Sequence, residues 1–196
     1  MDLTEWMQQH YGATVADLSG WWANQTRHGC FCGAGTRCQE AIDGLDRLCA
    51  AHDDAYRAVG VSGDDLAFMF SCEGLMLTVE ADTALATGAE SADLKADDPH
   101  SAPDVEDYRR NLVWLFSTRA TIGATLRRVR DAIEGFRKFL ADGASQWILA
   151  DAATPESVVT GFRQHVAYLE SLGVGSEQAA GVAQEFGVDP ASSGLA

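Results

Sequence analysis

The chain has 196 residues, of which 46% are hydrophobic, and its formal net charge is −15. This length suits one domain, or a domain with an appendage, and the apolar content excludes a chain that is disordered throughout. The negative charge argues against nucleic acid as a partner, and no apolar run is long enough to span a bilayer.

The N-terminal segment Asp2–Trp22 is predicted to form a short amphipathic helix. Its apolar residues recur at helical spacing: Leu3, Trp6, Met7, Tyr11, Val15, Leu18, Trp21 and Trp22. Residues 1–30 contain neither the basic region nor the apolar run of a signal peptide. We therefore expect either delivery outside the cytoplasm by a route that needs no such peptide, or a cytoplasmic location.

A glycine-rich segment with three cysteines follows, and residues 28–38 read HGCFCGAGTRC. The glycines at 29, 33 and 35 allow the chain to fold tightly, so that backbone carbonyls or amides can face a bound ion. This segment is therefore a candidate ion-binding loop.

Residues 42–59 are predicted to form a helix that carries chemically active side chains. Its apolar positions recur at spacings of three, four and seven: Ile42, Leu45, Leu48, Cys49, Tyr56 and Val59. His52 lies on the same face as Cys49 and Tyr56, and Asp53 follows His52 by about 100° around the helix axis. A potential general base and a potential ligand for a hard metal ion are thus expected to face one site.

Two segments of different character come next. Residues 60–63 are predicted to form a turn with Ser62 as a candidate N-cap, and the mostly apolar stretch from Leu66 to Val79 is predicted to form a helix. Residues 86–107 are polar, acidic and contain proline, so we expect an exposed linker or a long loop.

A long helix is predicted from Tyr108 to Leu140, and it concentrates basic residues. These residues form either a solvated face or a contact surface for lipid phosphates or an acidic protein: Arg127, Arg128, Arg130, Arg137 and Lys138.

Three further helical pieces are predicted after Asp142-Gly143. They are Ser145–Ala152, Pro155–Leu172 with Thr154 as N-cap, and Ser176–Phe186 with Gly187 as C-cap. The last two are expected to form a hairpin that serves as a docking module for a protein, as a dimer contact or as a lid on the core. Strand signals are nearly absent, so the predicted fold class is all-α.

Two motifs in this chain resemble the secreted phospholipase A2 superfamily. Cys32-Gly33-Ala34-Gly35 resembles its calcium loop, C-x-G-x-G, and Asp46, Cys49, His52-Asp53 and Tyr56 match its active-site helix, D-x-x-C-x-x-H-D-x-x-Y. The resemblance covers roughly residues 20–75, and it is specific because both motifs occur in the right order and at about the right separation.

The resemblance implies a calcium site and a hydrolytic mechanism. Ca²⁺ would be bound by the carboxylate of Asp53 and by the backbone carbonyls of Phe31, Gly33 and Gly35, an all-oxygen set that suits this ion. The Gly33 N–H would help to stabilise the oxyanion, and His52 would act as general base on the attacking water. A Cys32–Cys49 disulfide would hold the loop on the helix.

The family also orients its catalytic histidine with a second aspartate on an antiparallel partner helix. Asp65 is the best candidate for this carboxylate, and Glu73 and Asp64 are the runners-up. Tyr56 would either donate a hydrogen bond to this aspartate or serve in packing. The N-terminal helix of the family lines the acyl channel, so the same role or core packing is expected of Trp6, Trp21 and Trp22.

These inferences predict a phospholipase A2-like core of two antiparallel long helices at residues 1–85, an acidic linker at 86–107 and a C-terminal helical region at 108–190. The expected activity is calcium-dependent hydrolysis of the sn-2 acyl ester of a glycerophospholipid, at a membrane surface that the protein contacts peripherally.

The alternative is a non-catalytic module that binds a lipid or a protein. Five cysteines, at 30, 32, 38, 49 and 72, also leave open a thiolate zinc site. The family often has cysteines where this chain has Leu48 and Ala55, which removes accessory disulfides but leaves the chemistry in place.

Overall fold

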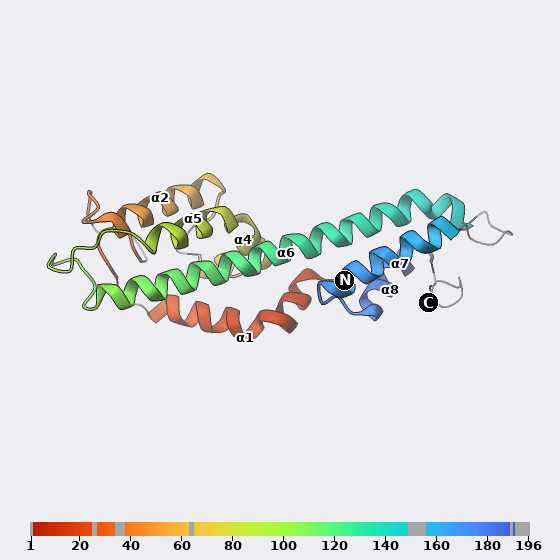
Figure 1. The fold of residues 1–196 in the computed structure, drawn as a ribbon, viewed down its shortest axis with the longest axis horizontal. Coiled ribbons are helices and arrows are strands. Elements are labelled where there is room, and N and C mark those ends of the chain that lie inside the picture. Colours follow the sequence, from red (N-terminus) through yellow and green to blue (C-terminus); the bar gives the residue numbers. More distant parts are fainter. Residues whose placement is uncertain are drawn as a thin grey trace. The chain divides into compact units, whose positions relative to one another are not determined.

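The computed structural model describes residues 2–24, 27–33, 38–62, 65–148, 156–188 and 190. Within these ranges the chain forms eight helices and no strand, apart from an isolated bridge between His28 and Cys32 (Figure 1). The helices are α1 (Leu3–Asn24), α2 (Gly44–Ala58), α3 (Leu66–Met69), α4 (Cys72–Leu77), α5 (Val79–Ala89), α6 (Val105–Ile148), α7 (Glu156–Ser171) and α8 (Ser176–Gln184). The all-α class expected from the sequence is confirmed. None of the helices in the described ranges is both long enough and apolar enough to cross a bilayer.

The chain divides into two compact units. The first unit is Met7–Thr125, and the second comprises Met1–Trp6 with Leu126–Ala196. This division differs from the three parts expected from the sequence, because residues 86–107 and the first half of α6 belong with α2 and α5 in the first unit. The candidate site described below lies entirely within the first unit.

Helix α2 (Gly44–Ala58) lies within the predicted range of residues 42–59 and has the predicted buried face. It begins after Asp43, whose side chain accepts a hydrogen bond from the Asp46 N–H at 2.9 Å, as an N-cap does. Its buried positions include Cys49, His52 and Tyr56. The chain turns after the helix at Gly60, which has a φ of +77°, a backbone conformation that glycine adopts without strain.

The prediction of a single helix from Leu66 to Val79 is wrong, because the chain forms α3, α4 and the start of α5 there. Helix α3 ends at Met69, with Phe70 as its C-cap, and Ser71 caps the start of α4, since its side chain accepts from the Gly74 N–H at 3.0 Å. A side chain at position 74 would collide with the Phe68 carbonyl oxygen, so glycine allows α4 to pack this closely against α3. As a result α5, and not the segment directly after the turn, is the helix that packs along α2.

The acidic segment between α5 and α6 contacts the cysteine-rich loop. The Gly29 N–H donates to the His100 carbonyl at 2.8 Å, and the Ala102 N–H donates to Nδ1 of His28 at 3.3 Å. Ala102 is buried, although most residues from 90 to 101 are exposed or half-buried. The segment is therefore anchored against the loop and is not a free linker.

Helix α6 covers the long helix predicted from Tyr108 to Leu140, but it continues through Asp142-Gly143, so the predicted break there is wrong. At Gly123 it approaches α4 and α5 closely: a side chain at this position would collide with the Leu75 carbonyl oxygen and would lie 2.7 Å from Val79 Cγ2. Glycine is therefore required for this helix contact.

The second unit packs the C-terminal half of α6 with α7 and α8. Its core is apolar and includes Leu126, Val129, Ile133, Phe136, Leu140, Phe162, Leu169 and Val182. Trp6 is 1% exposed, and its Nε1–H donates to the Gly173 carbonyl at 3.2 Å, so it packs in this core. Helix α8 ends at Gln184 with Glu185 as its C-cap, so the predicted C-cap Gly187, which has a φ of +74°, lies beyond the cap. Thr154 and Pro155 lie outside the described residues.

Two of the basic residues of α6 are paired with acidic side chains. Arg130 contacts Asp131, and Arg137 contacts Glu185 at 3.1 Å; all four side chains are at least two-fifths exposed. Such pairs contribute little to stability, and they fit the solvated face among the two roles that the sequence left open for these residues.

Candidate active site

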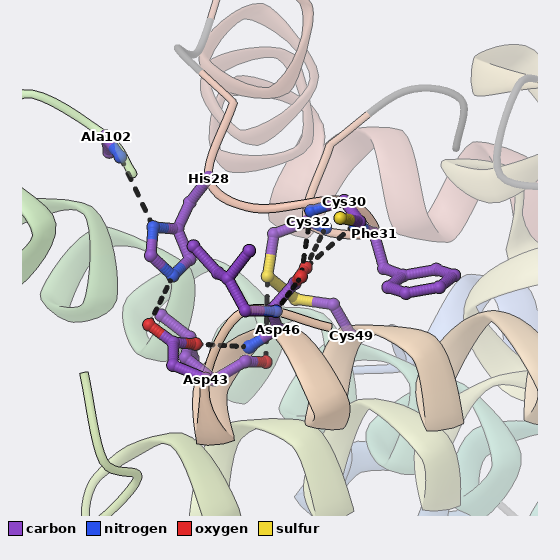
Figure 2. Close-up of a disulfide and its surroundings, with 10 residues drawn as sticks. His28, Cys30, Phe31, Cys32, Asp43, Asp46, Cys49 and Ala102 are labelled. Carbon is purple, nitrogen blue, oxygen red and sulfur yellow. Dashed lines mark hydrogen bonds and ion pairs between the residues drawn. A yellow bond between two sulfur atoms is a disulfide. The ribbon is translucent and has the colours of Figure 1, made fainter. Parts of the chain in front are cut away.

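Two disulfides organise the cysteine-rich loop. Cys32 pairs with Cys49, as the resemblance implies (Figure 2). Cys30 pairs with Cys38. The Cys32–Cys49 bridge attaches the loop to α2 one helical turn before Asp53. Because only Cys72 lies outside the two disulfides, the thiolates that a zinc site would need are engaged in sulfur–sulfur bonds.

The carboxylate of Asp46 binds the backbone of the cysteine-rich loop. It is fully buried and accepts hydrogen bonds from the N–H groups of Cys30 at 2.8 Å, Phe31 at 2.7 Å and Cys32 at 3.2 Å (Figure 2). A fourth N–H, that of Ile42, donates to it at 3.1 Å. Charge-assisted bonds of this kind are stronger than neutral ones, so Asp46 fixes the backbone of the loop.

The same bonds fix the direction of the loop carbonyls. In a trans peptide the C=O group points opposite to the N–H group. Since the Cys32 N–H faces Asp46, the Phe31 carbonyl, in the same peptide unit, points away from Asp46. One of the predicted calcium ligands is thereby kept from turning inward.

Gly33 continues the loop in a conformation that few other residues adopt. Its φ is +111°, and a side chain at this position would lie 3.0 Å from Arg27 Cγ. Among the described residues its N–H group has no hydrogen-bond partner, whereas the preceding carbonyl, that of Cys32, accepts from the His28 N–H at 3.2 Å. The Gly33 N–H is therefore available as a donor.

The predicted calcium ligands are described in part. Phe31, Gly33 and Asp53 are half-buried, and Gly35 lies outside the described residues. No group of three or more histidine, cysteine, aspartate or glutamate side chains is placed to hold a metal ion in the described part of the chain. Three of the four predicted ligands are backbone carbonyls, so such a site would not form a cluster of these side chains.

His52 contacts a carboxylate, but this carboxylate is Asp82 and not Asp65. Nε2 of His52 lies 2.9 Å from Oδ1 of Asp82, and the Tyr56 hydroxyl donates to the same oxygen at 2.5 Å. Asp65 is exposed and caps α3 by accepting from the Phe68 N–H at 3.0 Å. Of the two runners-up, Glu73 is exposed, and Asp64 lies outside the described residues.

The interrupted helix explains this correction. A continuous helix after the turn at Gly60 would have placed positions 65–68 opposite His52. Because α3 and α4 come between the turn and α5, the partner of α2 carries residues 79–89. Asp82 lies on its buried face with Leu85, Ala86 and Ala89, so it is an acidic residue within an apolar stripe, which is a signal present in the sequence.

The imidazole of His52 is enclosed by aromatic rings. The Tyr56 ring centroid is 4.0 Å away, and Phe116 of α6 approaches edge-on at 4.6 Å. Half-buried Trp22 in turn packs against Phe116, with 5.7 Å between centroids. His52 is 7% exposed, and its Nδ1 has no hydrogen-bond partner among the described residues.

Arg119 of α6 completes the site, although no motif in the sequence points to it. Its guanidinium is fully buried, and its Nε–H donates to Oδ2 of Asp82 at 3.0 Å. Arg119 occupies a position of α6 between the buried residues Phe116 and Ile122, so the available signal was a basic residue within an apolar stripe.

The remaining donors of Arg119 bind the groups around Asp82. Nη1 donates to the Met69 carbonyl at 3.0 Å, and Nη2 donates to the Tyr56 hydroxyl at 2.8 Å and to Oγ1 of Thr78 at 3.1 Å. The guanidinium also lies 4.8 Å from the centre of the Phe70 ring, within the range of a cation–π contact. We call His52, Tyr56, Thr78, Asp82 and Arg119 the Asp82 network.

The Tyr56 hydroxyl remains protonated within this network. Burial, together with the nearby Asp82 carboxylate, raises the pKa of Tyr56 far above its ordinary value. Tyr56 therefore donates its proton to Asp82 and does not compete with it as an anion.

The chain matches no model of a known protein family, and it has no match among curated proteins or among solved structures. The case for its chemistry therefore rests on the geometry of the Asp82 network and on the loop that Asp46 and the Cys32–Cys49 disulfide hold in place.

Proposed function

We propose that this protein is a calcium-dependent hydrolase of the phospholipase A2 type, which cleaves the sn-2 acyl ester of a glycerophospholipid. The observation that carries the proposal is the hydrogen bond between Nε2 of His52 and the buried carboxylate of Asp82, with Nδ1 of the same ring left unpartnered among the described residues. The resemblance to the phospholipase A2 superfamily supplies the substrate class.

His52 has the arrangement of a general base. With the Nε2 proton donated to Asp82, the neutral ring would carry its lone pair on Nδ1. This lone pair can take a proton from water while the water attacks the ester carbonyl, without a covalent intermediate. Asp82 then stabilises the imidazolium that forms, and Tyr56 keeps the carboxylate oriented through its own hydrogen bond.

The cysteine-rich loop fits a hard cation by the chemistry of its donors. Asp53 would offer a carboxylate, and Phe31, Gly33 and Gly35 would offer carbonyl oxygens, a set that suits Ca²⁺. The outward direction of the Phe31 carbonyl supports this assignment. When bound, the cation would polarise the ester carbonyl, and the Gly33 N–H would donate to the oxyanion.

The charge of the protein favours a zwitterionic lipid surface in the first test. With a formal net charge of −15, simple electrostatic attraction to anionic lipids is unfavourable. Phosphatidylcholine vesicles are therefore the substrate of choice. The α7–α8 hairpin remains a candidate docking site for a protein.

Release of fatty acid from phosphatidylcholine vesicles tests the proposal. We expect release with Ca²⁺, loss of release with excess EGTA, and loss of release in the His52→Gln variant. Asp53→Asn should require more Ca²⁺ for half-maximal rate, and the exposed His10→Gln should behave as wild type. Turnover that survives chelation would contradict the calcium role. Binding to vesicles without release of fatty acid would favour the non-catalytic alternative.

A further inference from the structure

We propose that Arg119 is a positioning residue that fixes the proton of His52 on Nε2 and so keeps Nδ1 available as the base. The inference deepens the proposed function and rests on it for its kinetic consequences, but not for its spectroscopic ones. Arg119 lies on α6, outside the segment that resembles a phospholipase A2, so neither the resemblance nor the two motifs assign it a role.

Arg119 can act only as a hydrogen-bond donor. A guanidinium in a protein is always protonated and can only donate hydrogen bonds. Arg119 has no exposed surface, and its hydrogen bonds within the described residues go to Asp82, Tyr56, Thr78 and the Met69 carbonyl, all in the first unit. Every oxygen that it contacts must therefore act as an acceptor toward it.

This requirement sets the direction of the next bond. The Tyr56 hydroxyl has one proton, and its oxygen accepts from Nη2 of Arg119 at 2.8 Å. The proton of Tyr56 is thus directed to Oδ1 of Asp82, 2.5 Å away. The Thr78 hydroxyl likewise accepts from Nη2, which leaves its own proton for Oδ2 of Asp82 at 3.1 Å or for the Gly74 carbonyl at 3.0 Å.

The direction of these hydrogen bonds determines which nitrogen of His52 carries the proton. Oδ1 of Asp82 accepts from Tyr56 and Oδ2 accepts from Arg119, so the carboxylate acts only as an acceptor, which is the role of its ionised form. The nitrogen of His52 that faces it must then be the donor, and the lone pair must lie on Nδ1. Arg119 also supplies the positive charge that a fully buried carboxylate needs.

Removing this charge should move a proton onto Nδ1. Without Arg119, the buried site regains neutrality by taking up one proton, which can be held in two ways. As a carboxylic acid, Asp82 would donate to Nε2 and the ring proton would move to Nδ1. As an imidazolium, His52 would be protonated on both nitrogens. In either case Nδ1 is no longer a base.

The experiment follows the nitrogen resonances of His52 in the ¹⁵N-labelled full-length protein at about pH 8, where an ordinary histidine is neutral. The His52→Gln spectrum identifies the resonances of this ring. In wild type we expect Nδ1 to be unprotonated and Nε2 to carry the proton. In Arg119→Met we expect Nδ1 to be protonated, and in Arg119→Lys, which keeps the charge, we expect Nδ1 to remain unprotonated.

The kinetic part uses the same variants. Arg119→Met should lower kcat about 10²- to 10⁴-fold, which is the range that loss of general base catalysis produces, with KM changed less than about threefold. Arg119→Lys should lose about tenfold or less, because an ammonium keeps the charge but cannot reproduce the planar set of donors. Arg110→Met is the matched control: Arg110 is exposed on the same helix and pairs with Asp107.

Several results would overturn the inference. These are a wild-type ring with its proton on Nδ1, a folded Arg119→Met protein with Nδ1 still unprotonated, and an Arg119→Lys protein with Nδ1 protonated. If Arg119→Met fails to fold, as circular dichroism would show, the wild-type and Arg119→Lys spectra decide. If wild type releases no fatty acid, the proposed function fails, but the spectra still test the role of Arg119.

Discussion

The first unit contains two histidine–aspartate pairs that look alike at their contact. Nε2 of His28 lies 3.0 Å from Oδ2 of Asp43, and Nε2 of His52 lies 2.9 Å from Oδ1 of Asp82. Both carboxylates are fully buried. The two pairs differ at the second nitrogen of each ring.

In the first pair both ring nitrogens are occupied. Nδ1 of His28 accepts from the Ala102 N–H, and Asp43 also accepts from the N–H groups of Asp46 and Lys95. Figure 2 shows this ring held between Asp43 and Ala102. His28 therefore clamps the cysteine-rich loop to the segment before α6. Within the described residues His52 uses Nε2 alone in this way, so the second nitrogen separates a structural histidine from a candidate base.

Glutamine substitutions should distinguish the proposed catalytic histidine from the structural one most clearly. His52→Gln should lower turnover about 10²- to 10⁴-fold, because no side chain is left to take the proton from water. His28→Gln should lower the free energy of unfolding by about 2–3 kcal/mol, because buried partners lose their hydrogen bonds, while the folded protein turns over at nearly the wild-type rate. Vesicle assays and urea unfolding measure the two effects. A large loss of turnover in folded His28→Gln would contradict the distinction.

Removal of each disulfide in turn shows which bridge joins the cysteine-rich loop, which His28 precedes, to α2, which carries His52. Cys32–Cys49 closes 17 residues and Cys30–Cys38 closes 8, so their loss should lower the free energy of unfolding by about 3 and about 2.5 kcal/mol. Only the first bridge connects the loop to α2. We therefore expect the Cys32→Ser/Cys49→Ser protein to lose calcium affinity more strongly, as measured by calorimetric titration. Equal affinities in the two double variants would argue against the loop as the calcium site.

Gly123 allows α6 to approach α4 and α5 closely, and the same helix carries Arg119 to Asp82. Gly123→Ala should destabilise the protein by about 1–3 kcal/mol and lower turnover, because the added methyl group forces α6 away from the Leu75 carbonyl. Gly135→Ala is the control on the same helix: a Cβ there meets nothing within 4 Å, so alanine should stabilise by about 0.5–1 kcal/mol. Thermal unfolding distinguishes the two, and a neutral Gly123→Ala would show that α6 can shift without loss.

The smallest expected effect concerns Tyr56. Its pKa is raised in the folded protein, so the phenol stays protonated where an ordinary tyrosine, with a pKa near 10.0, ionises. The stabilising contribution is complete below about pH 10 and is lost as the pH rises above that value. In a spectrophotometric titration, wild type and Tyr56→Phe should therefore show the same number of ionising tyrosines until the protein unfolds. Tyr56→Phe should lower turnover less than tenfold.

The sequence predicted the local features of this molecule well. Helical periodicity located α1, α2 and α6, and the spacing of His52, Cys49 and Tyr56 placed them on one buried face. The Cys32–Cys49 pairing was implied by the family resemblance and is present. These features depend on residues close in the chain or on a known motif, which is why they were accessible. The catalytic and calcium roles stay predictions.

The rest of the site depends on tertiary structure. Asp82 was missed because breaks at Phe70-Ser71 and at Thr78 divide an apolar stretch that reads as one helix, and this changes which residues face His52. Arg119 was missed because it lies 63 residues after Tyr56 in a region that carries no motif. Both residues are charged positions within apolar stripes, a pattern that indicates a buried partner but does not identify it.

Gly123 links the chemistry of this site to a pattern that can be recognised in other sequences. Arg119 and Gly123 are one helical turn apart, so the glycine that permits the helix contact and the arginine that reaches Asp82 lie on the same face. Loop lengths elsewhere can change the spacing of histidine and aspartate, but a single helix keeps arginine and glycine four residues apart. An R-x-x-x-G pair inside an apolar helical stripe is thus a search criterion for distantly related chains with a site like the Asp82 network.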